Sequence, residues 1–225
     1  MLSVELLDAT HARSGFDCGV EPLNRYLQQI ARQHITKGIS KTFVLVDEAA
    51  AAPKPVLGFF SISPCQVLGQ HVPAKWAKKL PRQIPALRLG RLAVARTQQG
   101  AGYGKALLVE AILRVARVAD VAGGIGLFVD AKDDAAAGFY ARFGFEPTPS
   151  DPLTLFMPAA TIRQLAPSTR RRFDALRSAS SSQSAFRPCR EHARHGLLRL
   201  LLHDAPRLSR AQRGGRDPCG SGRRA

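Results

Sequence analysis

The chain has 225 residues, 45% of them hydrophobic, and a formal net charge of +16. This length and apolar content suffice for one domain with a sizeable core, while no apolar run reaches the roughly 20 residues that cross a bilayer. The N-terminus lacks the charged-then-apolar order of a signal peptide. The four cysteines have no CxxC spacing, which argues against a zinc site and favours reduced thiols. We therefore expect a soluble cytoplasmic protein that uses no metal.

The positive charge is unevenly distributed along the chain. Residues 1–166 carry 19 Lys and Arg against 13 Asp and Glu, a net charge of +6. Residues 167–225 carry +10, and all 14 of their basic residues are arginine. We predict that this Arg- and Ser-rich tail is a disordered low-complexity segment. A nucleic-acid-binding arm is one interpretation, but arginine without lysine is typical of GC-rich DNA and favours a non-functional, even out-of-frame, extension.

Residues 1–166 alternate between strand and helix patterns, which predicts an α/β layer fold. Leu23, Leu27 and Ile30 recur at helical spacing and place one apolar face on a helix near the N-terminus. The loop at 49–55 contains Ala and Pro and predicts a hairpin. In chain order, the predicted elements are strand 4–7, helix 24–33, strands 41–46 and 56–63, short helix 74–80, strand 86–95, helix 104–119, strand 126–130, short helix 135–143 and strand 153–157.

The most informative motif is the glycine-rich turn RTQQGAGYGK at 96–105, which joins a predicted strand to a predicted helix. The free N–H groups of such a helix start, together with the helix dipole, bind an anion. A dinucleotide-binding turn would lie near the start of a parallel sheet, with an acidic residue at a strand end about 20 positions later. Asp120 instead falls between a helix and a strand. A P-loop would need Ser or Thr after Lys105, where Ala106 stands.

A second motif, AAGFYARFGFEP at 136–147, follows further along the chain. Together with the Q-x-x-G-x-G pattern of Gln99, Gly102 and Gly104, it resembles the GNAT superfamily of acetyl-CoA-dependent N-acetyltransferases. The resemblance covers residues 1–166, which it makes a GNAT domain. It implies a mixed, mostly antiparallel central sheet flanked by helices, and acetyl-CoA as the acetyl donor.

The GNAT resemblance assigns cofactor contacts to two segments. In that family the turn binds the CoA pyrophosphate, and the edge of the preceding strand binds pantetheine through backbone hydrogen bonds and can polarise the thioester carbonyl. The corresponding turn residues are Gln99, Gly100, Ala101, Gly102, Tyr103, Gly104 and Lys105, and the strand residues are Leu92, Ala93 and Val94. A point charge on the phosphates and a solvated position at the helix start explain Lys105 equally well.

Tyr140, in the second motif, is the candidate general acid. Acetyl transfer needs an unprotonated amine, a donor for the oxyanion and a proton for the leaving thiolate. A phenol with a reference pKa of about 10 keeps its proton at neutral pH and can supply it to the sulfur. Packing beside Phe139 and Phe143 is the alternative role, but phenylalanine would pack equally well, which favours catalysis.

A general base is not evident from the sequence. Strand 88–94 has arginines and no glutamate, where many GNAT relatives place a carboxylate. An α-amino group has a reference pKa of about 8, against about 10.4 for lysine, and needs less help to lose its proton. An ester group beside the amine lowers its pKa further, so the absence favours an α-amine acceptor.

A narrower resemblance lies in FDCGVEPLNRYL at 16–27, ARQ at 31–33, TFVL at 42–45 and PALRLGRLAV at 85–94. These segments resemble the GNAT toxins of bacterial toxin–antitoxin modules. Such toxins acetylate the α-amino group of aminoacyl-tRNA, which blocks translation, and a ribbon-helix-helix antitoxin neutralises them. The resemblance therefore implies aminoacyl-tRNA as substrate, that antitoxin as partner and a homodimer, with no membrane partner.

Basic side chains are the candidates for contacts with tRNA phosphates. Arg88 and Arg91 flank the strand, and regular alternation predicts that Arg91 shares a side with Leu89 and Ala93, near the acceptor. A solvated helix explains the group around Trp76 equally well. That group consists of Lys75, Lys78, Lys79 and Arg82.

Two other functions remain open from the sequence. One is a GNAT enzyme that acetylates a small amine or a protein N-terminus, in which case the basic residues are incidental. The other is a non-catalytic partner in a DNA-bound repressor complex.

Overall fold

A computed structural model describes residues 1–165, which belong to one compact unit. The tail predicted at 167–225 lies outside the described residues, so the boundary at 166 stays a prediction. In the described part, no helix combines the length and the apolar character that a membrane span requires.

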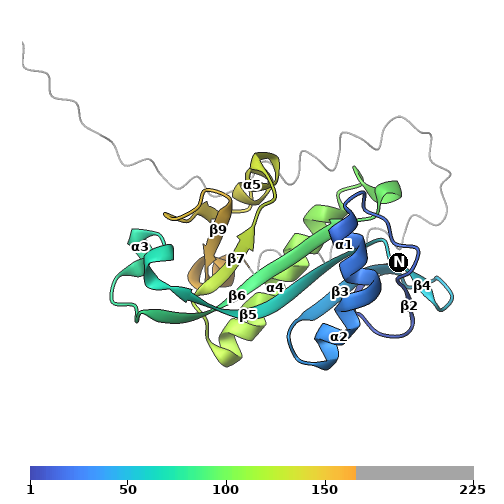
Figure 1. Cartoon of the computed structure of the whole chain (residues 1–225), viewed down its shortest axis with the longest axis horizontal. Coiled ribbons are helices and arrows are strands. Elements are labelled where there is room, and N and C mark those ends of the chain that lie inside the picture. Colours follow the sequence, from blue (N-terminus) through green and yellow to red (C-terminus); the bar gives the residue numbers. More distant parts are fainter. Residues whose placement is uncertain (166–225) are drawn as a thin grey trace, which may run out of the picture. The chain divides into compact units, whose positions relative to one another are not determined.

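A seven-stranded sheet forms the centre of the unit, in the order β1-β3-β5-β6-β7-β9-β8 (Figure 1). Every neighbouring pair is antiparallel except β6 and β7, which confirms the mixed, mostly antiparallel sheet. Its strands are β1 (Leu2–Leu6), β3 (Lys41–Asp47), β5 (Gly58–Leu68), β6 (Gln83–Val94), β7 (Gly126–Asp130), β8 (Glu146–Pro147) and β9 (Thr154–Pro158). A separate parallel pair joins β2 (His11–Ala12) to β4 (Lys54–Pro55). Of these two strands, β4 lies inside the loop predicted at 49–55.

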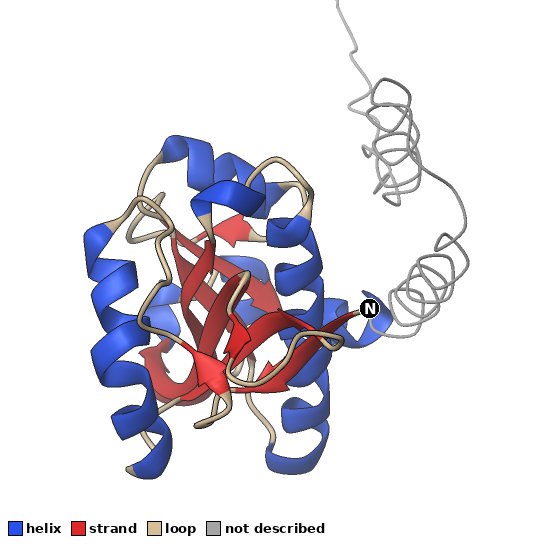
Figure 2. Ribbon diagram, turned by 90° about the vertical axis from the view of Figure 1, so that its right-hand side faces the viewer, coloured by secondary structure: helices blue, strands red, loops and turns tan. Residues whose placement is uncertain are grey.

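Helices flank the sheet on both sides (Figure 2). The bounds of the helices are α1 (Glu21–Arg25), α2 (Ala31–Thr36), α3 (Ala74–Ala77), α4 (Tyr103–Ala122) and α5 (Asp134–Ala141). A π-helical turn at Tyr26–Ile30 connects α1 to α2. The expected helix at 24–33 is therefore three consecutive pieces.

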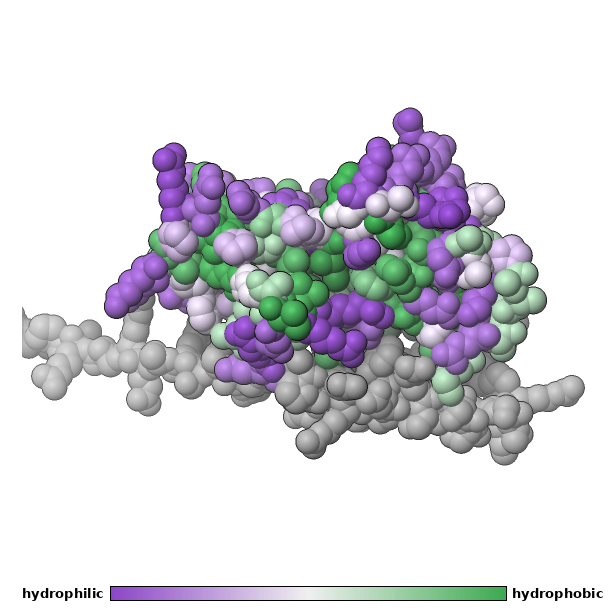
Figure 3. Space-filling model, turned by 90° about the horizontal axis from the view of Figure 1, so that it is seen from below, coloured by the Kyte–Doolittle hydropathy of each residue, from purple (hydrophilic) through white to green (hydrophobic). Residues whose placement is uncertain are grey.

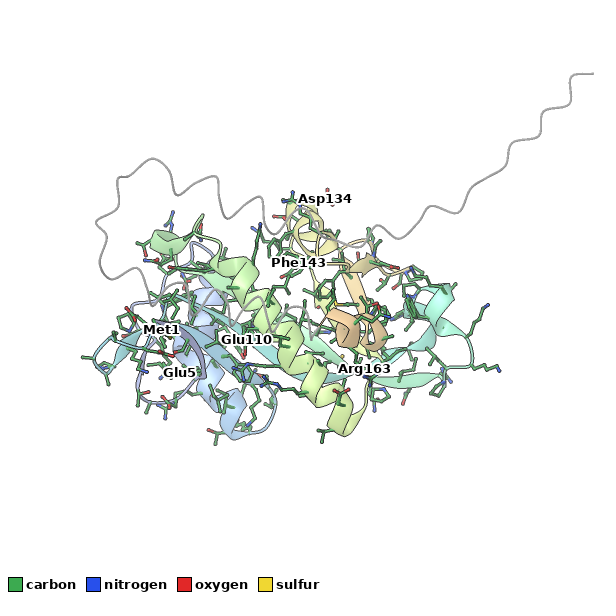
Figure 4. The ribbon with its side chains drawn as sticks, turned by 180° about the vertical axis from the view of Figure 1, so that it is seen from behind. Met1, Glu5, Glu110, Asp134, Phe143 and Arg163 are labelled. Carbon is green, nitrogen blue, oxygen red and sulfur yellow. The ribbon has the colours of Figure 1, made fainter. Side chains whose placement is uncertain are left out.

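Two apolar layers hold the helices to the sheet. On one face, Leu107 and Leu108 of α4 are fully buried with Phe60 of β5, and Figure 4 shows α4, which carries Glu110, running diagonally across that face. On the other face, Tyr26 and Leu27 are buried against the sheet. The apolar stripe predicted around Leu27 is thus the surface that packs.

The short helix predicted at 74–80 is wrong beyond Ala77. Lys79 has a φ of 61°, a left-handed backbone that a helix does not allow. Trp76 and Leu80 instead cover a small core of their own, which includes Phe128 of β7. The segment is therefore anchored by apolar contacts rather than being a free basic helix.

We predict that Gly126→Ala destabilises the fold by about 2–3 kcal/mol, a typical cost of overpacking. A Cβ at Gly126 would lie 2.2 Å from the carbonyl oxygen of Met157 and 2.9 Å from the Cα of Pro158, so β7 would have to move away from β9. Chemical denaturation measures the change. Gly15→Ala is the control, because a Cβ there meets no atom within 4 Å. Equal stabilities for the two variants would contradict the prediction.

Candidate active site

The strands β6 and β7 run side by side for three residues and then part. Leu87 to Leu89 pair with Leu127 to Val129, and no pair follows. β6 nevertheless continues to Val94 with β5 on its other side, and Figure 1 shows β7 turning away towards α5. Within the described chain, the part of β6 that follows Leu89 therefore has one edge without a strand partner.

The backbone of β6 presents hydrogen-bonding groups to that open edge. The N–H of Ala95 donates to the carbonyl of Leu57 at 2.9 Å, on the β5 side. Because peptide groups alternate along a strand, the N–H groups of Leu92 and Val94 face the open edge. Two of the three predicted pantetheine contacts are thus placed to bind an extended ligand. The third is wrong as a backbone contact, since alternation turns the peptide groups of Ala93 towards β5.

A bulge at Gly90 reverses the alternation of β6. Arg91 lies opposite Ser61 and Leu89 opposite Ile62, so Gly90 has no counterpart on β5. Leu89 packs on the α4 side, whereas Ala93 packs on the α1 side. The expectation that Arg91 shares a side with Leu89 is therefore wrong, because the extra residue turns Arg91 to the α1 face with Ala93.

Arg91 is held against the α1 face by an aromatic ring. Its guanidinium carbon lies 3.7 Å from the ring centroid of Tyr26, a cation–π contact. The hydroxyl of Tyr26 is 3.1 Å from those of Ser40 and Thr42, which fixes the ring from below. A positive charge thus has a defined position on the wall of the cleft beneath the open edge.

The other predicted phosphate contacts lie elsewhere. Arg88 forms an ion pair with Asp130, so its charge is balanced within the protein. Lys75 pairs with Glu146 at 2.7 Å. Lys75, Lys78 and Lys79 belong to the connection between β5 and β6, the end at which hydrophilic side chains project in Figure 3. The structure brings Arg91 alone of this predicted set into the cleft.

The glycine turn is shaped as an anion site. Gly100 and Gly102 have φ of +82° and +84°, where a side chain is strained, and a Cβ at either would meet no atom within 4 Å. Gly102 is the N-cap of α4 and offers no side-chain cap, and the N–H of Lys105 donates to its carbonyl, so the N–H groups of Tyr103 and Gly104 remain available. An exposed turn with free donors at the positive end of a long helix fits a pyrophosphate.

Gln99 has a structural role that the sequence did not indicate. Its side-chain amide nitrogen lies 3.1 Å from the carbonyl oxygens of both Cys18 and Val94 and donates to them. These bonds tie the turn to the end of β6 and to the segment before α1. The side chain of Gln99 therefore supports the site, and its backbone N–H already donates to the carbonyl of Arg96 at 3.4 Å, so its phosphate contact stays a prediction.

The open edge, the α1 segment and α5 enclose a cleft of about 350 Å³. Of the predicted residues it includes Arg91, Leu92, Ala93, Val94, Gln99 and Tyr140. The sequence analysis missed the others, which are Cys18, Val20, Leu23, Leu89, Gly90, Asp130, Lys132 and Ala136. For Asp130 a signal existed, because it is the polar residue that ends a buried predicted strand.

Tyr140 is buried in the wall of this cleft, with 8% of its surface exposed. The rings of Phe139 and Phe145 meet it edge-on at 5.2 and 5.7 Å. Asp133 caps α5 by accepting the N–H of Ala136 at 2.7 Å, which fixes the start of the helix that carries Tyr140. Burial raises the pKa of Tyr140 to about 12, so its hydroxyl is a proton donor at neutral pH.

We predict that Gly102→Ala raises the Kd for coenzyme A about tenfold. The turn of the free variant relaxes from the left-handed backbone, and regaining it on binding costs about 1–2 kcal/mol, of which 1.4 kcal/mol corresponds to a factor of ten in binding. Calorimetric titration with coenzyme A measures the change. Gly38→Ala carries the same kind of strain, with φ +70° and open space, away from the turn. Unchanged affinity in Gly102→Ala, or equal weakening in both variants, would contradict the prediction.

Comparison with known proteins identifies related chains. The sequence model of the acetyltransferase (GNAT) domain matches residues 39–147. A tRNA-acetylating toxin of Mycobacterium tuberculosis (strain ATCC 25618 / H37Rv) is 34% identical over 152 residues, which are 68% of this chain and 89% of the relative.

Two solved structures extend the comparison. AtaT complexed with acetyl-methionyl-tRNAfMet is 32% identical, with a TM-score of 0.68, over 73% of this chain and 99% of that one. A Tyr-to-Phe variant of AtaT bound to acetyl-CoA and the C-terminus of the antitoxin AtaR is 31% identical, with a TM-score of 0.60, over 73% and 97%. The open edge of β6 and the buried Tyr140 line one cleft, and together with these relatives they show that this chain belongs to the GNAT family of acetyltransferases.

Proposed function

We propose that this protein is a toxin that transfers acetyl from acetyl-CoA to the α-amino group of aminoacyl-tRNA. The observation that carries the proposal is the cleft, where an open strand edge, a protonated tyrosine and a fixed arginine meet. The tRNA-acetylating relative and the AtaT complex with acetyl-methionyl-tRNA support this acceptor.

The chain supplies separate contacts for the pyrophosphate and for the pantetheine arm of acetyl-CoA. The first turn of α4 binds the pyrophosphate through its N–H groups, beginning at Gly102. The open edge of β6 binds the pantetheine arm through the N–H groups of Leu92 and Val94. Because the edge leads from the turn to the point where β7 departs, the thioester lies deep in the cleft, on the same side as Tyr140.

The reaction uses few groups of the protein. Acetyl-CoA supplies the acetyl group as a thioester. An N–H group of the β6 edge donates a hydrogen bond to the thioester carbonyl, whose oxygen gains negative charge when the amine attacks. Tyr140 then donates its hydroxyl proton to the departing sulfur, for which its raised pKa keeps it protonated.

The basic residues provide contacts for the phosphates of a polyanion such as tRNA. Arg91, stacked on Tyr26, lies in the cleft and is positioned for a phosphate near the acceptor end. Lys78 and Lys79 lie at the end of the β5–β6 hairpin and serve as more distant contacts. A tRNA substrate also places the enzyme in the cytoplasm. The AtaT complex with AtaR supports an antitoxin as the partner, while its ribbon-helix-helix class and a homodimer remain predictions.

The two alternative functions differ in what they leave unexplained. An enzyme for small amines or protein N-termini needs no arginine fixed inside the cleft. A non-catalytic partner in a repressor complex needs neither the free donors of the turn nor the buried tyrosine. Neither alternative is favoured by an observation of its own.

Incubation of the purified protein with labelled acetyl-CoA and aminoacylated total tRNA tests the proposed function. We expect label on the α-amino group of the aminoacyl ester, found by mass spectrometry after nuclease digestion, and none on deacylated tRNA. Label found on protein N-termini or on small amines, but not on aminoacyl-tRNA, would replace the proposal with the alternative enzyme.

We predict that Tyr140→Phe lowers kcat by about 100-fold or more, the range expected for loss of a general acid. The ring packing between Phe139 and Phe145 is kept, so the melting temperature and the affinity for coenzyme A stay close to wild type. Single-turnover acetylation of aminoacyl-tRNA measures the rate. Full activity in the variant would exclude Tyr140 as the acid.

The pH dependence of the rate follows from the same residue. An ordinary tyrosine is half ionised at about pH 10, whereas the pKa of Tyr140 is raised to about 12. An acid acts only while protonated, so we expect no alkaline loss of kcat up to about pH 10. Rapid single-turnover experiments are required, because the aminoacyl ester hydrolyses in alkali. A halved kcat at that pH in folded protein would contradict the assignment.

A further inference from the structure

Among the described residues that line the cleft, Asp130 is the only one with a carboxylate. It follows directly after Val129, which forms the last pair of β7 with Leu89 of β6. Asp130 therefore lies at the point where the two strands begin to part. The open edge of β6 starts at this point, and Tyr140 lines the same cleft.

Two neighbouring strands fix the carboxylate of Asp130. Thr154 of β9 lies directly opposite, and its hydroxyl is 3.2 Å from one carboxylate oxygen. Arg88 of β6 forms an ion pair with the other oxygen. A carboxylate accepts about four hydrogen bonds, so these two partners set its orientation and leave capacity for a further donor. The side chain is half exposed, which gives a ligand access.

We propose that Asp130 binds the α-amine of the acceptor and takes its proton during acetyl transfer. This inference rests on the proposed function and adds the missing base. Strand β6 carries no carboxylate, but β7 places one at the point where β6 and β7 part. The pairing with Arg88 explains why that arginine, placed beside the cleft, is not a free phosphate contact.

The other polar side chains of the cleft are unsuited to this role. Arg91 and Lys132 are cations, and they repel an ammonium group. Burial raises the pKa of the Cys18 thiol, whose hydrogen points to the carbonyl of Val20, so it stays neutral and offers no base. Asp130 alone combines a negative charge with a free acceptor position.

The proposed step is balanced in atoms and charge. The lone pair of the amine forms the N–C bond to the acetyl carbon, and the C–S bond breaks. The proton that the nitrogen loses passes to the carboxylate of Asp130, and the hydroxyl proton of Tyr140 passes to the sulfur. Solvent then reprotonates Tyr140 and deprotonates Asp130, which restores the enzyme.

Asp130→Asn is the first test, because it keeps the size of the side chain and an oxygen for Thr154. We expect kcat/KM for aminoacyl-tRNA to fall about 100-fold at neutral pH, with the Kd for coenzyme A unchanged. The deficit shrinks at higher pH, where hydroxide replaces the carboxylate as acceptor of the proton that the nitrogen loses. A wild-type rate would overturn the proposal, and so would a loss of the same size at every pH.

Asp130→Asn also leaves Arg88 without its ion-pair partner, so the effect of that unpaired charge is controlled separately. In an Arg88→Met background, adding Asp130→Asn still causes the large loss if the carboxylate itself acts. Recovery of the rate in that double variant would show that unpaired Arg88 was the cause and would overturn the proposal. Asp151→Asn is the matched control, since Asp151 also contacts Thr154 but does not line the cleft, and we expect it to keep the wild-type rate.

Chemical rescue distinguishes a proton acceptor from a residue that only maintains the structure, because an added acid can replace the first and not the second. Asp130→Ala leaves space for a small acid, so sodium formate restores part of its rate and does not accelerate wild type. No rescue, with folded protein that binds coenzyme A, would count against the role as proton acceptor. Wild-type acetylation of aminoacyl-tRNA is measured alongside, so failure of the Asp130 proposal is distinct from failure of the proposed function.

Discussion

The separation of β6 from β7 after Leu89 is the constraint on which the site depends. If β7 continued beside β6 beyond Asp130, it would satisfy the N–H groups of Leu92 and Val94, and no ligand could bind there. Because they part, these two N–H groups face the cleft, where a ligand can accept their hydrogen bonds. The glycine turn at the end of β6 then extends the same ligand path to the start of α4.

The bulge at Gly90 acts together with this separation. It keeps Leu92 and Val94 in the apolar layer below α4, while it turns Arg91 towards Tyr26 on the opposite face. Beside the open edge, the strand therefore has one side that packs in the apolar layer and one side that carries the charge of Arg91. Bulges commonly redirect side chains next to active sites.

Much of the fold and part of the site were predictable from the sequence. Strand 126–130 agrees with β7 residue for residue, and the motif around Tyr140 contributes Ala136 and Tyr140 to the cleft, whereas Gln99 alone of the glycine turn lines it. Local pattern carries these features, because strand alternation and left-handed glycines depend on near neighbours. Gly90 within a strand was itself a signal of a bulge, but the strand was interpreted as regular.

The remaining features depend on contacts between distant segments. Arg88 and Asp130 are 42 positions apart and meet only because β6 and β7 are neighbours in parallel. The stacking of Arg91 on Tyr26 likewise needs the packing of the π-helical turn against the sheet. The sequence does not show which residues form such pairs, so Arg88 was interpreted as a phosphate contact, and Asp130 was missed although it is the polar residue that ends a predicted strand.

Residue-resolved amide hydrogen exchange, with and without coenzyme A, tests the open edge most directly. The N–H groups of Leu92 and Val94 face the cleft, while that of Ala93 is turned to β5. The account predicts that coenzyme A slows exchange at Leu92 and Val94 and leaves Ala93 almost unchanged. Unaltered exchange at Leu92 and Val94, with the coenzyme bound, would contradict it.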